Sequence, residues 1–254
     1  MCCLNDINTK NTYMRTVKFI LPALLIALNF ISCRKDDPWK VCGKGDNITE
    51  IRSVKGFSGI DLCISADLYY QQDSIYWVEV TAQPNVLSVI ETAVYGNVLK
   101  IKTNTWLVRH KPITVVVHSP DITYLSLSGS GNIYVQNAIA ANYMDILVNG
   151  SGNISVPSLT AKTLSTKISG SGNIKITGGE VSDEDLRISG SGNIDALNLI
   201  ANTCRVNVSG SGDVFVNVLQ KLYVTISGSG DVKYKGMPAV ETHISGSGKI
   251  IHIN

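Results

Sequence analysis

The stretch Ser169-Gly170-Ser171-Gly172-Asn173-Ile174-Lys175-Ile176 decides the fold, because its first part recurs throughout the second half of the chain. The tetrapeptide Ser-Gly-Ser-Gly, once with Asn in the first position, occurs seven times in the sequence. The copies are spaced by 21, 20, 20, 20, 18 and 18 residues and begin at Ser128, Asn149, Ser169, Ser189, Ser209, Ser227 and Ser245. Near-identical units at an almost constant period indicate a repeat architecture.

The residues around each copy alternate between apolar and polar. Ile168, Gly170, Gly172, Ile174 and Ile176 share one parity, whereas the Ser and Asn residues between them share the other. This period of two predicts strands with one buried face. The glycines fall on the buried parity, where they would let the chain bend and bring the facing wall close.

If each unit is one turn of a coil, successive turns pair in parallel and equivalent polar residues stack into ladders that fix the register. The sequence therefore predicts an all-β fold, a right-handed parallel β-helix (β-solenoid) with coils of about 20 residues. A propeller blade would need about 40 residues, and a sandwich gives no reason for the repeated tetrapeptide. The expected ladder includes Ser169, Ser171, Asn173, Ser189, Ser191, Asn193, Ser209, Ser211 and Asp213.

Residues 45–118 lack the tetrapeptide but contain runs rich in Val, Ile, Thr and Tyr, separated by breakers such as Gln83-Pro84-Asn85. We interpret residues 45–118 as irregular first coils of the same solenoid, and residues 119–254 as its regular repeats. A separate small β domain is the alternative for the first part.

The motifs Gly45-Asp46-Asn47-Ile48 and Arg52-Ser53-Val54-Lys55-Gly56-Phe57-Ser58-Gly59-Ile60, followed by the Ser-Gly-Ser-Gly-Asn-Ile series, resemble one known family. The chain is similar over residues 45–254 to the putative auto-transporter adhesin, head GIN domain family. That resemblance implies a right-handed β-helix on a secreted or lipid-anchored envelope protein of unproven function. Because the sequence ends a few residues after the last repeat, we expect a lipid to provide the anchor.

The N-terminus has the pattern of a cleaved leader. Residues 1–32 form the predicted signal peptide, with 14–32 as the leader if Met14 rather than Met1 is the start. The uncharged run from Phe19 to Ile31 is too short to span a bilayer as a helix but suits a signal-peptide core. Because Phe30-Ile31-Ser32-Cys33 resembles a lipobox, we expect lipidation at Cys33 and a lipidated tether over residues 33–44. An ordinary secretory leader is the alternative.

Lys35, Asp36 and Asp37 follow the predicted lipidation site and resemble an export signal to the outer face of the outer membrane. A solvated tether would contain charged residues as well. We therefore expect a lipid-anchored protein of the cell outer membrane that faces the cell surface.

The charge balance argues against one class of partner. The leader holds Lys10, Arg15 and Lys18 against Asp6, so the remaining chain has equal numbers of basic and acidic residues. Nucleic acid binding needs a basic excess, so we expect no nucleic acid partner.

Three cysteines remain after Cys33, namely Cys42, Cys63 and Cys204. An envelope location permits disulfides, and three single pairings are possible. Cys42–Cys63 is the pairing we favour, with Cys204 as a buried apolar residue.

The residues of the repeats offer little catalytic chemistry, and we expect no cofactor and no metal. The repeated Ser residues have no His or Lys that recurs with them to activate a nucleophile. Asp213 and Asp231 would stack as a carboxylate pair, but they continue the Asn ladder. Glu180, Asp183, Glu184 and Asp185 are interpreted as a solvated acidic turn between repeats.

The best binding candidate is the irregular stretch from Asn104 to Lys111, because it combines an aromatic residue with three basic ones. The candidate ligand-binding residues are Trp106, Arg109, His110 and Lys111. Trp106 could instead pack over the end of the core, and Tyr69-Tyr70 is a weaker candidate.

Three functions follow from the sequence. The leading hypothesis is a non-catalytic, surface-displayed lipoprotein that binds a glycan or protein ligand, with possible self-association through the solenoid ends. The second is a structural envelope protein without a specific ligand. The third is a carbohydrate-active enzyme, which a tight acidic cluster on one face would favour, whereas a concave aromatic strip would favour the binder.

Overall fold

The computed structural model describes residues 39–253. The described part of the chain from residue 41 to residue 253 forms one compact unit, which contains the hydrophobic core from Phe57 to Val232. The predicted leader, the lipidation site Cys33 and the export residues Lys35, Asp36 and Asp37 lie outside the described residues.

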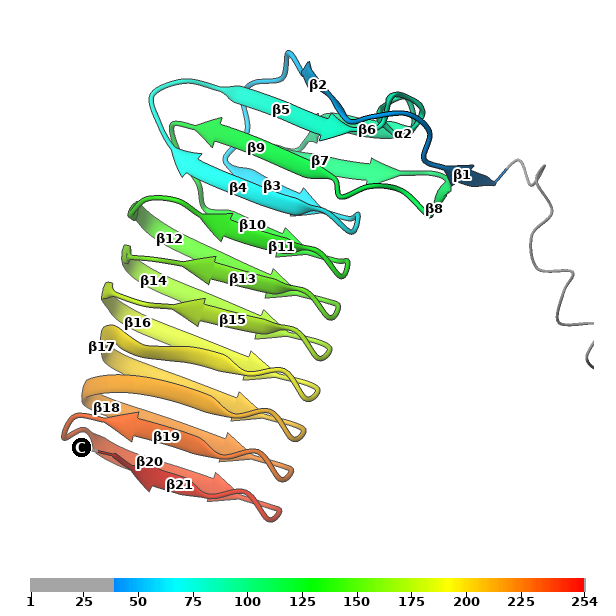
Figure 1. Cartoon of the computed structure of the whole chain (residues 1–254). Coiled ribbons are helices and arrows are strands. Elements are labelled where there is room, and N and C mark those ends of the chain that lie inside the picture. Colours follow the sequence, from blue (N-terminus) through cyan, green and yellow to red (C-terminus); the bar gives the residue numbers. More distant parts are fainter. Residues whose placement is uncertain (1–38, 254) are drawn as a thin grey trace, which may run out of the picture. The chain divides into compact units, whose positions relative to one another are not determined.

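The regular repeats form a stack of coils in which each coil contributes to two parallel strand ladders (Figure 1). The strands are β10 (Tyr124–Leu127), β11 (Asn132–Val135), β12 (Ile139–Val148), β13 (Asn153–Val156), β14 (Leu159–Ile168), β15 (Asn173–Ile176), β16 (Gly179–Ile188), β17 (Ile194–Val208), β18 (Val214–Ile226), β19 (Val232–Lys235), β20 (Ala239–Ile244) and β21 (Ile250–His252). Equivalent residues of successive coils lie opposite one another, for example Asn153 and Asn173. The predicted all-β parallel solenoid is confirmed.

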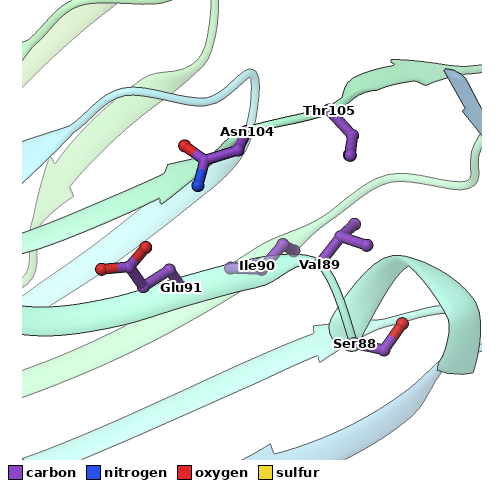
Figure 2. A pocket seen from close by; sticks show the side chains of 6 residues that line it. All are labelled: Ser88, Val89, Ile90, Glu91, Asn104 and Thr105. Atoms are coloured by element: carbon purple, nitrogen blue, oxygen red, sulfur yellow. The ribbon is translucent and has the colours of Figure 1, made fainter. Parts of the chain in front are cut away.

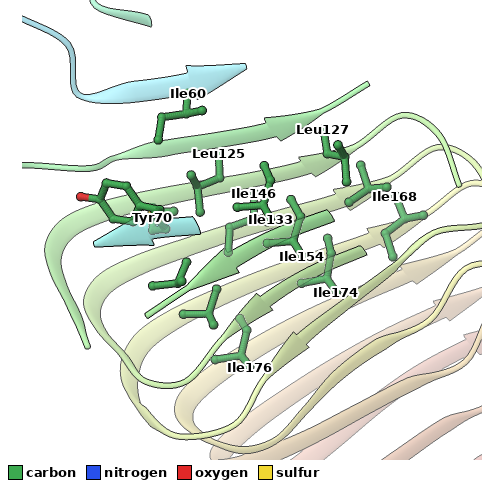
Figure 3. Packing of buried hydrophobic residues seen from close by; sticks show 14 of the residues in the cluster. Ile60, Tyr70, Leu125, Leu127, Ile133, Ile146, Ile154, Ile168, Ile174 and Ile176 are labelled. Carbon is green, nitrogen blue, oxygen red and sulfur yellow. The ribbon is translucent and has the colours of Figure 1, made fainter. Parts of the chain in front are cut away.

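The core consists of the apolar residues that alternate with polar residues along each strand of the repeat (Figure 3). Ile154, Ile174 and Ile194 occupy equivalent positions in three successive coils, and each is almost completely buried. Each buried isoleucine contributes about 2 kcal/mol relative to exposure. The residues between them point outward, so a slip of one residue would bury polar groups and expose the core.

The glycines of the tetrapeptide are required by contacts between coils. A Cβ atom on Gly172 would lie 2.0 Å from the carbonyl oxygen of Gly152 and 2.7 Å from a methyl group of Val148. The same clash recurs one coil later, where a Cβ on Gly192 would lie 1.9 Å from the oxygen of Gly172. The sequence led us to expect a close approach of the facing wall, but the closest backbone atoms belong to the preceding coil.

The first part of the unit combines parallel coils with antiparallel strands. Its elements are β1 (Lys40–Cys42), β2 (Ile48–Ile51), β3 (Gly59–Leu62), β4 (Asp67–Gln72), β5 (Trp77–Ala82), α2 (Pro84–Leu87), β6 (Ile90–Tyr95), β7 (Val98–Thr103), β8 (Trp106–Val108) and β9 (Thr114–Ser119). β3 and β4 pair in parallel with β10 and β11, although they lack the tetrapeptide. Ile64-Ser65-Ala66 takes its place, and Gly131 packs against the backbone of Ala66.

The order of coils in space differs from their order in the sequence. β7 and β9 pair in parallel with the other edges of β3 and β4, so the β3–β4 coil lies between them and the regular repeats. Beyond them, β6 pairs antiparallel with β7, β5 with β9, and β2 with β5. The solenoid therefore begins with antiparallel strands that cover its first parallel coils.

The predicted disulfide is wrong, because Cys42, Cys63 and Cys204 are all free thiols. The Cys63 thiol lies 4.0 Å from the carbonyl oxygen of Asp61, and the Cys42 sulfur lies 4.0 Å from a guanidinium nitrogen of Arg109. The two thiols thus have separate partners. Burial raises the pKa of Cys63 to about 11, which lowers its reactivity. Cys204 is fully buried, in agreement with the sequence analysis.

The predicted acidic turn is also wrong, because these residues belong to strand β16. Glu184 faces the core with 3% exposure, opposite Leu164 and Cys204 of the neighbouring coils. Neither carboxyl oxygen of Glu184 has a hydrogen-bond partner among the described residues. Burial raises the pKa of Glu184 to about 7, against a smaller opposite effect of the Cys204 thiol.

Candidate functional site

The outward polar residues of the repeats form a continuous ladder. The side-chain amide of Asn173 donates to Asn153 Oδ1 at 2.9 Å, and that of Asn193 donates to Asn173 Oδ1 at 3.0 Å. The ladder begins before the first tetrapeptide, where Asn132 donates to the Asp67 carboxylate at 2.8 Å. These side chains bind their counterparts in neighbouring coils and so stabilise the register.

The two aspartates of the ladder serve the same purpose. Asp213 Oδ1 accepts the backbone N–H of Asp231 at 2.9 Å, and Asp231 Oδ1 accepts that of Lys249 at 2.8 Å. The second oxygen of Asp213 lies 3.8 Å from the Lys233 ammonium group. One oxygen of each carboxylate therefore accepts a backbone N–H of the next coil, as the Asn side chains of the ladder do.

The serines of the ladder contribute through the backbone. The N–H groups of Ser171, Ser191 and Ser211 each donate to a glycine of the preceding coil at 2.9–3.0 Å. Those of Ser169, Ser189 and Ser209 each donate at 2.8 Å to Val148, Ile168 and Ile188. The hydroxyl groups lie at the surface, so the side-chain ladder consists of the Asn and Asp residues.

The segment predicted to bind a ligand lies in and after β8. Trp106 is 73% exposed, so it does not pack over the end of the core. Arg109 has a positive φ of 48°, which is unusual for a residue with a side chain and is often associated with function. Lys111 forms an ion pair with Asp46 at 2.5 Å, and this contact lowers the pKa of the Asp46 carboxyl. His110 Nδ1 lies 2.7 Å from the carbonyl oxygen of Lys111.

A pocket with both polar and apolar lining residues adjoins the beginning of this segment. It has a volume of about 440 Å³ and is lined by Ser88–Glu91 on one side and Asn104 and Thr105 on the other (Figure 2). Glu91 accepts a hydrogen bond from Tyr95 at 2.8 Å and lies 3.3 Å from the Lys102 ammonium group. The hydrogen bond from Tyr95 and, to a smaller extent, the contact with Lys102 lower the pKa of the Glu91 carboxyl. The pocket therefore presents an ionised carboxylate beside an amide and hydroxyl groups.

Sequence reasoning missed a second concave surface, which we call the Ile51–Tyr76 groove. It has a volume of about 450 Å³ and is lined by residues 51–55 and 75–78. Ile51, Ile75 and Tyr76 are 61%, 52% and 37% exposed, although they are apolar or aromatic. The Tyr76 ring is held 5.1 Å from the ring of buried Phe57. The adjacent aromatic residues Tyr76 and Trp77 were the signal in the sequence that could have revealed this groove. In the other aromatic pair, Tyr69-Tyr70, the Tyr70 side chain belongs to the core.

A family model described as putative auto-transporter adhesin, head GIN domain, matches residues 56–238. The chain belongs to this family. No match was found among curated proteins.

Solved structures of similar proteins support the membership of the head GIN family. A putative adhesin from Bacteroides fragilis is 28% identical with a TM-score of 0.80, and the match covers 84% of this chain and 100% of that one. A putative lipid binding protein from Parabacteroides distasonis is 27% identical with a TM-score of 0.69, covering 85% of this chain and 100% of that one. A putative adhesin from Parabacteroides merdae, 21% identical with a TM-score of 0.69 and coverage of 85% and 99%, shares the fold.

The family description points to a cell-surface or envelope location and to a role in adhesion. Between residues 39 and 253, no helix has the length and apolar character needed to cross a membrane. Nor does that part of the chain bring together three or more His, Cys, Asp or Glu side chains that could hold a metal ion.

Proposed function

We propose that this head GIN protein is a non-catalytic cell-envelope lipoprotein, anchored to the outer membrane through Cys33 and displayed on the cell surface. Its first coils, which directly follow the tether, bind a glycan or protein ligand. The observation that carries the proposal is the distribution of exposed aromatic side chains. Among residues 41–253, three of the four exposed Tyr and Trp side chains lie before residue 119. They are Tyr76, Tyr95 and Trp106, and the fourth is Tyr143 in the regular coils.

The chemistry around Trp106 suits a sugar. An exposed indole ring stacks on the apolar face of a pyranose, while carboxylate, amide and hydroxyl groups bind its hydroxyls. Asn104 and Glu91 supply such groups in the neighbouring pocket. The basic residues Arg109, His110 and Lys111 follow within the same segment and would favour a ligand with acidic groups.

The Ile51–Tyr76 groove favours a second candidate, an apolar ligand such as an acyl chain. Its exposed isoleucines would be covered by such a ligand, and Lys55 at its margin suits an anionic end. The relative from Parabacteroides distasonis is named as a putative lipid binding protein.

We propose further that the protein associates with itself through one end of the solenoid. A structural envelope role without ligand, and a carbohydrate-active enzyme, are the alternatives that the experiments must separate.

Protease accessibility on intact cells tests the display. The wild type is compared with a variant in which Lys35, Asp36 and Asp37 are all changed to Ala, and lysed cells provide the control for intrinsic cleavage. We expect digestion of the wild type and protection of the variant. Protection of both on intact cells would place the protein in the periplasm and overturn surface adhesion, leaving the structural role.

A further inference from the structure

Strand β20 has one edge that no strand among residues 39–253 covers. It pairs in parallel with β18, and its other edge has no partner in that part of the chain. Val240 and Ile244 lie opposite Leu222 and Ile226, which are fully buried in the preceding coil. On β20 the same core positions are 40% and 43% exposed. The residues that would form the core of this coil thus lack a covering layer.

The backbone groups at this edge are oriented for a further strand. In a parallel sheet, alternate residues direct both their N–H and their C=O toward the same neighbouring strand. The N–H of Ser245 donates to Ile226 at 2.7 Å, which assigns the odd-numbered residues to the β18 side. Val240, Thr242 and Ile244 therefore direct their backbone groups to the open edge.

We propose that a second copy of this chain pairs antiparallel with this edge, across a two-fold axis through Thr242. In this register Thr242 lies opposite Thr242 of the second copy, and Val240 lies opposite Ile244. Each of these pairs exchanges two backbone hydrogen bonds, because their N–H and C=O groups face the open edge. The two apolar core positions cover each other.

The outward side chains of Glu241 and His243 select this register over its neighbours. Residues that oppose each other in an antiparallel pair share a face, so the alternatives are shifts that centre the axis on Glu241 or His243. Those shifts place Glu241 opposite Glu241, or His243 opposite His243. The Thr242 register places each Glu241 opposite the His243 of the second copy, so that an imidazole N–H can donate to the carboxylate in both pairs.

A dimer with two-fold symmetry is also a closed assembly. Both copies use the same edge, so the dimer leaves no second β20 edge to recruit further copies, and fibres do not form. This dimer is a specific form of the self-association in the proposed function, and its formation requires neither the ligand nor the lipid anchor.

The test is sedimentation equilibrium of the chain from Trp39 onward, which contains the whole described core. We expect a monomer–dimer equilibrium for the wild type. Thr242→Pro removes the central donor at the open edge and should raise the dimer dissociation constant at least tenfold. Thr242→Val keeps this donor and should leave the constant within about threefold. Circular dichroism checks that both variants retain the fold.

A charge exchange tests the register and distinguishes it from unspecific contact. Glu241→Lys should weaken the dimer about tenfold, since it loses both cross-strand pairs. The double variant Glu241→Lys/His243→Glu restores complementarity and should recover the wild-type constant. A wild type that stays monomeric at high concentration, oligomers larger than the dimer, or a double variant as weak as the single one would overturn the proposal. Failure of ligand binding or of surface display would leave this result unchanged.

Discussion

The regular coils and the first coils of this solenoid share parallel stacking but use their surface residues differently. In the regular coils, the outward Asn and Asp side chains bind the next coil, as in the chain from Asn153 through Asn173 to Asn193. In the first coils, Trp106 of β8 and Tyr76, which immediately precedes β5, are exposed and take no part in this ladder. The comparison indicates that the repeated surface maintains the fold, while the irregular surface is free to bind.

The largest effect is expected from a substitution that disrupts the stacking of the regular coils. Gly172→Ala places a methyl group 2.0 Å from a carbonyl oxygen of the preceding coil, so we expect a loss of about 3 kcal/mol in the free energy of unfolding. Gly178→Ala is the matched control, because its Cβ would meet only Pro157 O at 3.4 Å. Urea unfolding measures both. Equal stability of the two variants would show that the tetrapeptide glycines are not required for stacking.

The buried carboxylate inside the regular coils predicts a pH dependence. Glu184 has a pKa of about 7 against an ordinary value of 4.5, so the folded state binds this proton more tightly than the unfolded state. The resulting stabilisation is complete below about pH 4.5 and is lost as the pH rises through about 7. The difference corresponds to roughly 3 kcal/mol.

Glu184→Leu should remove this part of the pH dependence and raise the stability at pH 8. Asp185→Asn is the control, because Asp185 lies beside Glu184 in sequence but is partly exposed and paired with Arg187 at 2.8 Å. Unfolding midpoints between pH 5 and pH 8 provide the measurement. A wild-type curve parallel to that of Glu184→Leu would contradict the buried, protonated state.

A smaller effect is expected from the polar ladder. Asn173→Ala removes side-chain contacts to both neighbouring coils and should cost about 1.5 kcal/mol. Asn173→Asp keeps the oxygen that accepts the N–H of Asn193, as Asp213 does for Asp231, and should cost less. Thermal unfolding of the two variants compares them. A cost for Asp equal to that for Ala would mean that the accepted backbone hydrogen bond contributes little.

The regular coils could be predicted well from the sequence, because the inward-facing apolar residues, the glycines of the turns and the Asn/Asp ladder all repeat with the same period. The β3–β4 coil was harder to recognise, since Ile64-Ser65-Ala66 replaces the tetrapeptide and only its register with β10 and β11 reveals it. The spatial order of β7 and β9 depends on pairings between distant segments, which no local pattern encodes.

The acidic turn was misjudged for a different reason. Counting back by two from the buried Ile188 and Leu186 places Glu184 on the inward parity, but its charge favoured an exposed interpretation. The Ile51–Tyr76 groove was missed because its two walls, residues 51–55 and 75–78, come from separate segments of the sequence.

The most direct test of the account is binding of the chain from Trp39 onward to a glycan array, together with Trp106→Ala and Tyr143→Ala. Both substitutions remove exposed aromatic rings, at 73% and 45% exposure, and should change the stability by less than about 0.5 kcal/mol. We predict that Trp106→Ala weakens binding to the selected glycans at least tenfold and that Tyr143→Ala leaves it unchanged. Equal loss in both variants, or binding that neither affects, would contradict the assignment of binding to the first coils.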